Sequence, residues 1–349
     1  NDPRRSRSPL SLDAIDRLLG PGQVSPSLDT IDDLLGAKSV QGPAGGDPGA
    51  SKCDPRPIIR IGLPYGSDGE LMKAVRRTGA PVLLSTGGLW RRASSRRAEA
   101  GFTPFPETAW SHDMALDSAG FTAMLQGGYQ WTADAYVEWM AMNGRGAEHS
   151  GREFPFAWWS AMDVCCEPEI AKDRAEVLAR IDQTVDYYEQ CFSLWLYYIV
   201  DEGFGSAGWF PEPMPILQGR TPADYVSCAR RLAEVRDRWL AARSSSDLSY
   251  QDELGGFGED EQGTGLPDLV GVGSVCRREV SGPEGIVPVV EALDRALPKR
   301  TRLHLFGVKG QTLSALGPLL RRVLSIDSMA WDFAAREDAY LRRRRQCGS

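Results

Sequence analysis

The sequence PMPILQGRTPADYVSCARRLAEVRDRWLAA at residues 213–242, followed by LVGVGSV at residues 269–275, shows the pattern that decides the fold. A short apolar run leads into an amphipathic helical run, and a second short apolar run rich in valine follows. This alternation is typical of strand–helix–strand units, which build parallel sheets. The polar stretch at residues 244–265 separates the helical run from the second apolar run, and we expect it to be an exposed loop.

The same alternation extends in both directions from this unit. The expected strands are short apolar or β-branched runs at residues 58–64, 81–86, 114–118, 158–164, 213–219, 269–275, 302–308 and 324–329. Seven or eight units over roughly 290 residues predict an α/β fold, the (β/α)8 TIM barrel, in which the active site lies at the C-terminal ends of the strands. A doubly wound sheet is the alternative, but no GxGxxG follows the first strands and nothing resembles a Walker loop.

Length and charge narrow the class further. A chain of 349 residues fits a single barrel with an appendage, and a hydrophobic fraction of 42% excludes a wholly disordered or collagen-like chain. Lysine and arginine number 40 against 47 acidic residues, which gives a net charge of −7. This balance argues against indiscriminate coating of nucleic acid, but it leaves room for a local basic groove on an acidic body.

The first 55 residues differ in composition from the rest. They contain a near-repeat, SPLSLDAIDRLLGPG at 8–22 and SPSLDTIDDLLGAKS at 25–39, followed by a stretch rich in glycine and proline. Each repeat predicts a short amphipathic helix. The repeats could dock on a protein partner, or they could form a marginally ordered extension, and we favour the extension. The expected organisation is therefore a flexible tail at 1–55 and a barrel domain at 56–349.

The cysteines and the hydropathy predict a cytoplasmic protein. Seven scattered cysteines, an odd number, do not form a recognisable disulfide framework, which points to a reducing compartment. No stretch is long and apolar enough for a membrane span, and the first residues lack the apolar region of a signal peptide. We also expect no metal site, because His112, His149 and His304 show no ligand spacing and the adjacent Cys165 and Cys166 suit a structural role.

Three of the expected strands end in an aspartate, namely Asp117, Asp163 and Asp327. A single aspartate in this position is more often a helix N-cap than a catalytic group. Barrel closure, however, would place three strand ends around one pocket. From the residues alone, the prediction is a pair of carboxylates that acts on a glycosidic bond as nucleophile and acid/base, with the third carboxylate holding the substrate. A sugar hydrolase would use the same pair, and a catalytically idle barrel is a further alternative.

Two of these aspartates lie in segments that resemble a known family. LDSAGFTAMLQGGYQW (116–131) is similar to the first signature of tRNA-guanine transglycosylases, and IDSMAWDFAAREDAYL (326–341) resembles their nucleophile segment. HLFGVKG, LQG and VGVGSV resemble further segments of the family and occur in the family's order. The residues of the two Asp-Ser signatures most resemble the branch of the family that acts on DNA, the 7-deazaguanine DNA transglycosylases (DpdA-like proteins). The resemblance covers residues 58–345.

The resemblance implies a role for each matching residue. Asp327 matches the nucleophile that attacks the anomeric carbon, and Asp117 matches the acid/base for the leaving and incoming bases. The matching positions for base recognition are Asp163, Gln218, Gly219, Gly273 and Ser118, with Phe121 and Phe306 on the two faces of the base. The implied reaction replaces guanine in DNA by a 7-deazaguanine base such as preQ0, through a covalent aspartyl-nucleoside intermediate. The implied partners are DNA and the free base, and a tRNA enzyme is the alternative.

The sequence also departs from the family. Ala119 stands where the family has glycine, the acceptor-strand glycine pair is only partly present, and the Cys-x-Cys-x-x-Cys…His zinc pattern is missing. Cys347 alone could begin such a pattern. We therefore identify no cofactor, and we expect a structural zinc only if a C-terminal module follows beyond this sequence.

Two basic runs stand out, WRRASSRR at 90–97 and LRRRRQ at 341–346. The first follows the expected strand at 81–86, so it is expected on a loop at the catalytic mouth, with Trp90 available for stacking. The residues that we expect to contact nucleic-acid phosphates are Arg91, Arg92, Arg96 and Arg97. An ordinary solvated surface is the alternative for this run, and for the terminal run it is the simpler interpretation.

Overall fold

The computed structural model describes residues 57–63, 75, 77–93, 99–105, 113–149, 154–202, 210–244, 265–308 and 310–328. These residues belong to one compact unit, Asp54–Phe333. The predicted tail at 1–55, most of the predicted loop at 244–265 and all residues after 328 lie outside the described part of the chain.

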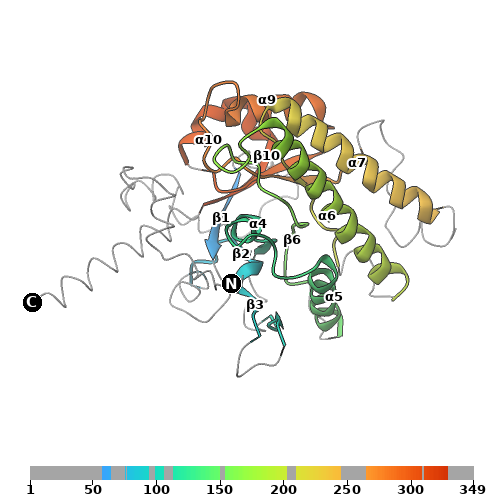
Figure 1. Cartoon of the computed structure of the whole chain (residues 1–349). Coiled ribbons are helices and arrows are strands. Elements are labelled where there is room, and N and C mark those ends of the chain that lie inside the picture. The colour runs from blue at the N-terminus through green and yellow to red at the C-terminus, as the bar shows by residue number, and fades with distance from the viewer. Residues whose placement is uncertain are drawn as a thin grey trace, which may run out of the picture. The chain divides into compact units, whose positions relative to one another are not determined.

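Eight parallel strands form one curled sheet (Figure 1). The strands are β1 (Ile58–Leu63), β2 (Val82–Ser85), β5 (Met114–Asp117), β6 (Trp158–Trp159), β7 (Ile216–Leu217), β8 (Leu269–Val272), β9 (Arg302–Leu305) and β10 (Val323–Ser328). Their order is β6-β5-β2-β1-β10-β9-β8-β7, so β1 and β10 are neighbours, with Arg60 in register with Asp327. Each pair that is adjacent within this order is parallel, which confirms the predicted α/β class.

The two edge strands of the sheet approach each other. Ser160 and Met214 form a parallel bridge just beyond β6 and just before β7. The backbone N–H of Met214 donates to the carbonyl of Trp159 at 2.8 Å, and the N–H of Ala161 donates to the carbonyl of Met214 at 2.9 Å. A curled sheet whose edges meet in this way is compatible with a TIM-like barrel. All eight predicted strands are present, but the runs at 158–164 and 213–219 contribute only two residues each to regular strand.

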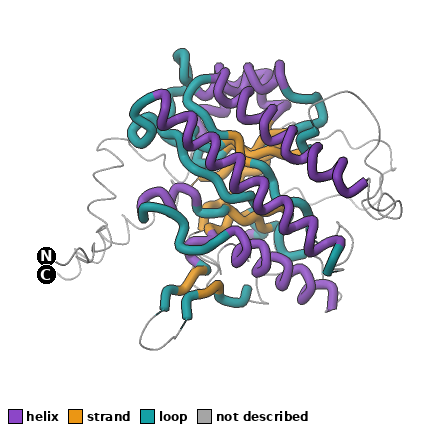
Figure 2. Tube along the Cα trace, turned by 45° about the vertical axis from the view of Figure 1, so that its right-hand side comes forward, coloured by secondary structure: helices purple, strands orange, loops and turns teal. Residues whose placement is uncertain are grey.

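Helices follow most of the strands and pack on one another outside the sheet (Figure 2). They are α4 (Gly120–Leu125), α5 (Ala133–His149), α6 (Arg174–Val200), α7 (Pro222–Ser244), α9 (Ile286–Ala296), α10 (Gly310–Leu316) and the 3₁₀ helices η1 (Thr86–Gly88) and η3 (Gly317–Arg322). Within the described part of the chain, no helix is long and apolar enough to cross a membrane.

Local sequence explains the start of the longest helix. Asp173 precedes α6 and accepts a hydrogen bond from the backbone N–H of Glu176 at 2.8 Å. The Glu176 carboxylate accepts in turn from the N–H of Lys172 at 3.1 Å. One N–H of the first turn and one N–H just before the helix are thus satisfied by side chains, an arrangement similar to a capping box.

A small antiparallel hairpin, β3 (Trp90–Arg91) with β4 (Gly101–Phe102), lies outside the main sheet. The predicted loop at 90–97 is therefore partly wrong, because its first two residues form a strand. The ring of Phe102 packs against Trp90 and Trp139, with centroid distances of 4.8 and 5.1 Å. These aromatic contacts provide the apolar cover that the hairpin needs, since an isolated two-stranded ribbon is marginal in water.

The core has two layers, one on each face of the strands. Val82 and Leu84 belong to the large cluster between sheet and helices, whereas Leu83, between them in sequence, belongs to a second cluster. That second cluster consists of Leu83, Ala115, Trp158, Met214 and Ile216, with Leu269 and Phe306 packed against it. Because successive side chains of a strand point to opposite faces, the second cluster fills the inner face of the curled sheet.

A buried arginine fastens η3 and β10 to the C-terminal end of α9. The Arg322 side chain is 3% exposed, and its Nε lies 2.6 Å from Oδ1 of Asp294. Its two Nη atoms donate to the backbone carbonyls of Asp294, Leu297, Pro298, Lys299 and Thr301 at 2.7–3.1 Å. The guanidinium therefore satisfies the carbonyls that α9 leaves unpaired at its end.

We expect Arg322→Met to lower the free energy of unfolding by about 3–5 kcal/mol, because several carbonyls lose their donor and Asp294 loses its buried partner. Arg321→Met is the matched control: its side chain is 57% exposed and contacts the same Asp294 at 2.8 Å. The control should cost less than about 1 kcal/mol. Urea unfolding of both variants measures the difference, and equal losses would contradict the assigned role of Arg322.

Candidate active site

The carboxylate of Asp117 stands at the C-terminal end of β5, paired in register with Ser85 of β2. The chain then turns through Ala119, whose φ of 68° is left-handed, and α4 begins at Gly120. Removal from water, and then the charges of Asp163 and Asp327, raise the pKa of Asp117 well above its usual value. Hydrogen bonds from the backbone of Ala119 and Ser118 oppose this rise without cancelling it. Asp117 therefore has the character of a proton donor.

Asp163 lies four residues beyond β6 and is held by several donors. The Ser118 hydroxyl donates to its Oδ1 at 2.9 Å, and Nε2 of Gln218 donates to its Oδ2 at 2.5 Å. The Tyr129 hydroxyl donates to its backbone carbonyl at 3.1 Å. Burial raises the pKa of Asp163 to about 6, against the lowering effect of the bonds from Ser118 and Gln218. The carboxylate is thus ionised at neutral pH and fixed on both oxygens.

Gly120 makes room for this carboxylate. A Cβ atom at position 120 would lie 2.3 Å from Oδ1 of Asp163, far closer than a real Cβ contact. The glycine is needed for its lack of a side chain and not for its backbone angles, since it begins an ordinary helix. The first turn of α4 therefore abuts the carboxylate directly.

Gln218 and the predicted glycines come together in the structure. Gln218 is fully buried after β7, and a Cβ at Gly273 would lie 2.2 Å from its Nε2. A Cβ at Gly219 would lie 2.6 Å from the Cβ of Asp224 in α7. Packing thus provides a physical reason for both glycines. Their backbone contacts to a base stay a prediction.

Asp327 of β10 is held from one side. The backbone N–H of Gly307 donates to Oδ1 of Asp327 at 2.8 Å, and Nε2 of His304 lies 3.3 Å from the same oxygen. Burial lowers the pKa of His304, although Asp327 pulls it upward, so the imidazole is neutral at pH 7. The ring is oriented by Ser325, whose Oγ is 2.8 Å from Nδ1. The carboxylate is therefore positioned without a full ion pair to His304.

The two predicted stacking rings occupy different surroundings. Phe121 is partly exposed on α4, and the guanidinium carbon of Arg277 lies 5.2 Å from its ring centroid. Phe306 packs on the inner cluster of the sheet, and its ring is 4.5 Å from that of His304. The structure gives no base between them, so the sandwich stays a prediction.

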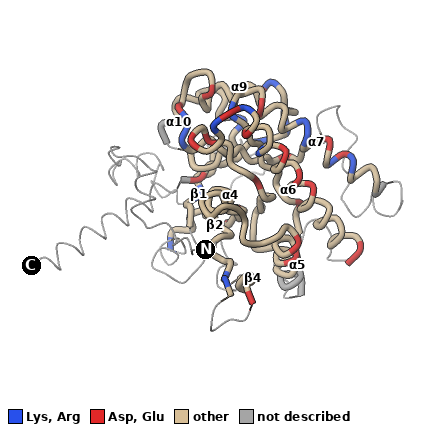
Figure 3. Tube along the Cα trace, in the orientation of Figure 1, with Lys and Arg blue, Asp and Glu red and all other residues tan. Residues whose placement is uncertain are grey.

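Of the four predicted phosphate-binding arginines, the structure describes two. Arg91 and Arg92 are exposed on and just after β3. This strand pairs with β4, and Figure 3 shows basic residues beside the β4 label. Arg91 donates to the carbonyl of Gly88 at 2.7 Å, and Arg92 donates to Oε1 of Gln126 at 3.2 Å. Arg96 and Arg97 lie outside the described residues. The two described guanidinium groups have few protein contacts and face solvent.

Sequence reasoning missed several residues of the site. The sequence does not single out Tyr129 or the buried carboxylate of Glu167, and it gives His304 no role at the site beyond excluding it as a metal ligand. His304 could have been found, because it stands two residues before Phe306 in the same strand run and so shares its face. Tyr129 and Glu167 follow irregular segments, and no periodicity signals them.

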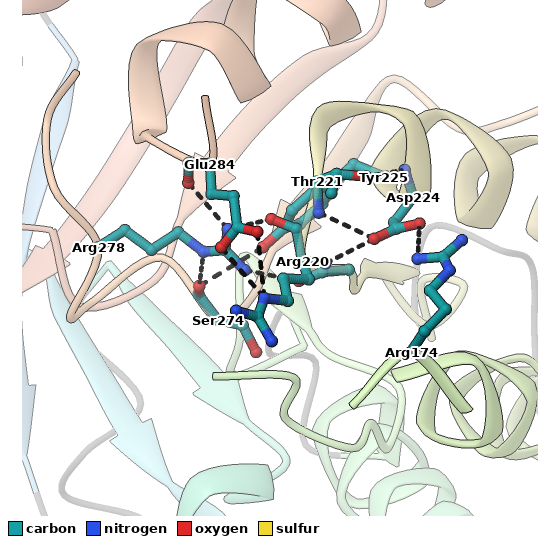
Figure 4. A network of polar contacts seen from close by, with 9 residues as sticks. Arg174, Arg220, Thr221, Asp224, Tyr225, Ser274, Arg278 and Glu284 are labelled. Atoms are coloured by element: carbon teal, nitrogen blue, oxygen red, sulfur yellow. Dashed lines mark hydrogen bonds and ion pairs between the residues drawn. The ribbon is translucent and has the colours of Figure 1, made fainter. Parts of the chain in front are cut away.

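A polar network ties the loops after β7 and β8 together (Figure 4). Arg278 donates to the carbonyls of Gly219, Ser274 and Glu284 at 2.5–2.9 Å, and it also bonds the carbonyl of Arg220. The Tyr225 hydroxyl donates to the carbonyl of Gly273 at 2.8 Å. The backbone that follows Gln218 and the backbone at Gly273 and Ser274 are therefore held by side chains.

No cluster of three or more histidine, cysteine or acidic side chains suited to a metal ion occurs among the described residues. Cys165 and Cys166 are buried free thiols, and burial raises the pKa of both. Both are therefore neutral at physiological pH, in keeping with the structural role predicted for them. Cys347 lies outside the described part of the chain.

The comparison with protein families gave one match. The model described as "DpdA: DeoxyPurine in DNA protein A" matches residues 74–241 and 248–348, which is well over half of the chain. Both Asp-Ser segments fall within the matched residues. A comparison with curated proteins gave no match.

The raised pKa of Asp117 makes a prediction about stability and pH. The folded state binds the Asp117 proton more tightly than the unfolded state, so the contribution of Asp117 to the free energy of unfolding should fall as pH rises from about 4 toward the folded-state pKa. Asp117→Asn removes this titration. The stability of the variant relative to wild type should therefore increase with pH across this window.

Asp268→Asn is the control, because Asp268 precedes the N-terminal end of β8 and its side chain is 80% exposed. Its Oδ1 lies 3.3 Å from Nε of Arg300. Its stability relative to wild type should change little with pH. Chemical unfolding at several pH values measures both, and a pH-independent difference for Asp117→Asn would show that this carboxyl titrates normally.

Proposed function

The chain belongs to the DpdA family, and on this premise we propose that it replaces guanine in DNA with a 7-deazaguanine base such as preQ0. The observation that carries the proposal is the approach of Asp163 and Asp327 to Asp117, whose pKa is raised by burial and then by the charges of these two neighbours. We take the curled sheet as a closed (β/α)8 barrel, so that these strand ends surround one mouth.

In the proposed reaction, Asp327 is the nucleophile. Both of its close contacts fall on Oδ1, so we assign Oδ2 to the attack on the anomeric carbon C1′. The new bond joins Oδ2 to C1′ while the bond from C1′ to N9 of guanine breaks. Asp117 donates a proton to the departing N9, and its raised pKa supports this role. The product of this half-reaction is an aspartyl ester of the nucleoside.

The second half-reaction reverses these roles. The incoming base gives its N9 proton to the Asp117 carboxylate, and N9 then attacks C1′. The bond from C1′ to Asp327 breaks, which restores both carboxyl groups to their starting states. The same residue thus acts first as acid and then as base, as in retaining glycosidases.

We assign base recognition to the edge formed by Asp163 and Gln218. A buried carboxylate suits the N–H donors of the purine edge, and Gln218 supplies an amide beside it. Ser118 fixes Asp163. We keep backbone contacts from Gly219 and Gly273 as part of the proposal, although Arg278 and Tyr225 already bond their carbonyls. Phe121 and Phe306 would cover the two faces of the base.

Access to C1′ requires the nucleotide to leave its stack, because a carboxylate at a barrel mouth cannot reach it inside a duplex. Arg91 and Arg92, which are exposed, and the arginines at 96 and 97 would then contact the flanking phosphates. The family description supports DNA over the tRNA alternative. Mass spectrometry of nucleosides from both DNA and tRNA of expressing cells tests the choice, and modified base in tRNA alone would overturn it.

Asp327→Ala should abolish the covalent protein–DNA adduct and all base exchange, because the variant lacks the attacking oxygen. Binding of the free base should persist, since Asp163 and Gln218 are unchanged. Denaturing gels of protein incubated with a guanine-containing oligonucleotide report the adduct. Asp268→Ala, which removes a carboxylate before β8, should behave as wild type, and exchange of labelled base by Asp327→Ala would refute the nucleophile assignment.

Arg91→Ala combined with Arg92→Ala should weaken DNA binding and flatten its dependence on salt, by about 0.9 in the logarithmic slope for each lost phosphate contact. The matched control changes Lys299 and Arg300 to alanine, two exposed cations that precede β9. Affinities at several salt concentrations decide the point. Identical slopes for the Arg91/Arg92 variant and wild type would make these arginines an ordinary solvated surface.

A further inference from the structure

The amide of Gln218 has a defined orientation in the structure. Its Nε2 donates to Oδ2 of Asp163 at 2.5 Å, and its Oε1 accepts a hydrogen bond from the Ser274 hydroxyl at 2.6 Å. If the amide were rotated by half a turn, the carboxylate would face a second acceptor in place of a donor. The orientation therefore decides whether Asp163 is stabilised or opposed by its neighbour.

The proton of the Ser274 hydroxyl is directed toward Gln218. The backbone N–H of Cys166 donates to Oγ of Ser274 at 2.6 Å, so the oxygen already accepts one bond. Its single proton then faces Oε1 of Gln218 at 2.6 Å, while Oε2 of Glu167 is farther away at 3.3 Å. Ser274 is 5% exposed, so water does not readily replace these partners.

The backbone at Ser274 is fixed in an uncommon conformation. Its φ of 53° lies in the left-handed region, which residues other than glycine seldom adopt. The neighbouring carbonyls are both occupied, that of Gly273 by Tyr225 and that of Ser274 by Arg278 (Figure 4). Arg278 also bonds the carbonyl of Gly219, next to Gln218. The two loops are thereby locked with the serine hydroxyl pointing at the glutamine.

We propose that Ser274 is a positioning residue whose hydroxyl fixes the Gln218 amide with its nitrogen toward Asp163, so that the carboxylate presents acceptors to the donors of a purine edge. The contact with the base rests on the proposed function. The orientation of the amide does not, because it is a property of the protein alone.

The electrostatic surroundings of Asp163 determine what the loss of Ser274 would do. Two acids act on it, Asp117 from β5 and Glu167 from the segment after β6. The neutral groups around it are Tyr129, Tyr136, Cys165, Cys166 and Cys228. The donors that oppose burial include Ser118 and Gln218. If Gln218 no longer held its nitrogen toward the carboxylate, the pKa of Asp163 should rise above its present value of about 6.

Three variants distinguish the effect of losing the Ser274 hydroxyl from the effect of straining the backbone at this position. Ser274→Ala and Ser274→Gly both remove the hydroxyl, but only glycine adopts a positive φ without strain. Thr184→Val is the matched control, because the Thr184 hydroxyl is also buried and accepts a bond from the N–H of Val164 at 3.0 Å, in the same segment as Cys166. The control should leave Gln218 unchanged.

The first measurement needs no ligand. The side-chain amide signals of Gln218 in ¹⁵N-labelled protein, identified by their loss in Gln218→Ala, report its two hydrogen bonds. Both Ser274 variants should shift these signals and speed their exchange with solvent, and Thr184→Val should not. Unchanged signals in both Ser274 variants would overturn the proposal.

The second measurement is the pH profile for binding of free 7-cyano-7-deazaguanine. Wild-type binding should weaken below about pH 6 as Asp163 gains a proton. In both Ser274 variants this midpoint should move to higher pH, with affinity at pH 7 reduced about tenfold and largely recovered at higher pH. A purely structural role would reduce affinity equally at every pH, and that result would contradict the proposal.

A double-mutant cycle adds the final criterion. In the Gln218→Ala background, Ser274→Ala should have no further effect on binding, because the group that it positions is already absent. Additive losses would contradict the proposal. If the wild-type protein does not bind the probe while the Gln218 signals shift as expected, the proposed function is wrong but the positioning by Ser274 stands.

Discussion

Asp117 is buried beside two further carboxylates, and its repulsion by Asp163 and Asp327 is the constraint that the surrounding structure must meet. The three carboxylates differ in their hydrogen-bond partners. Asp163 receives donors on both oxygens, Asp327 receives a backbone N–H beside a neutral imidazole, and Asp117 keeps a raised pKa. When the surroundings give neighbouring carboxyl groups different pKa values, one site can hold both an ionised carboxylate and a protonated carboxylic acid at the same pH.

Much of this arrangement could be predicted from the residues. Strand-ending aspartates are readable because parallel strands end at a common edge, so Asp117 and Asp327 were located by pattern alone. The eight apolar runs were likewise located. Regular strand was overestimated at 158–164, where the chain leaves the sheet after Trp159 and continues as an irregular segment to Asp163. Asp163 is thus positioned by side-chain donors and not by a strand end.

Other parts of the site could not be predicted from the sequence, for a physical reason. Tyr129 reaches Asp163 from the segment between α4 and α5, and Ser274 reaches Gln218 across 56 residues of chain. Contacts of this kind depend on the tertiary approach of loops, which have no periodicity. The glycines illustrate the same point: the sequence marks Gly120 and Gly273 only as small residues, whereas the structure shows which polar atom occupies the space beside each.

The pairing of β1 with β10 has a consequence for how the protein acquires its activity. Arg60 and Asp327 lie side by side in the sheet, although most of the chain separates them. Contacts between such distant segments form late, because the entropy of closing a long loop opposes them. A ribosome releases β1 long before β10, so a nascent chain has the loops that hold Asp163 and Gln218 before it has Asp327 in position. Asp327, the proposed nucleophile, is therefore positioned last of the three aspartates, and on that proposal incomplete chains should be unable to cleave a glycosidic bond.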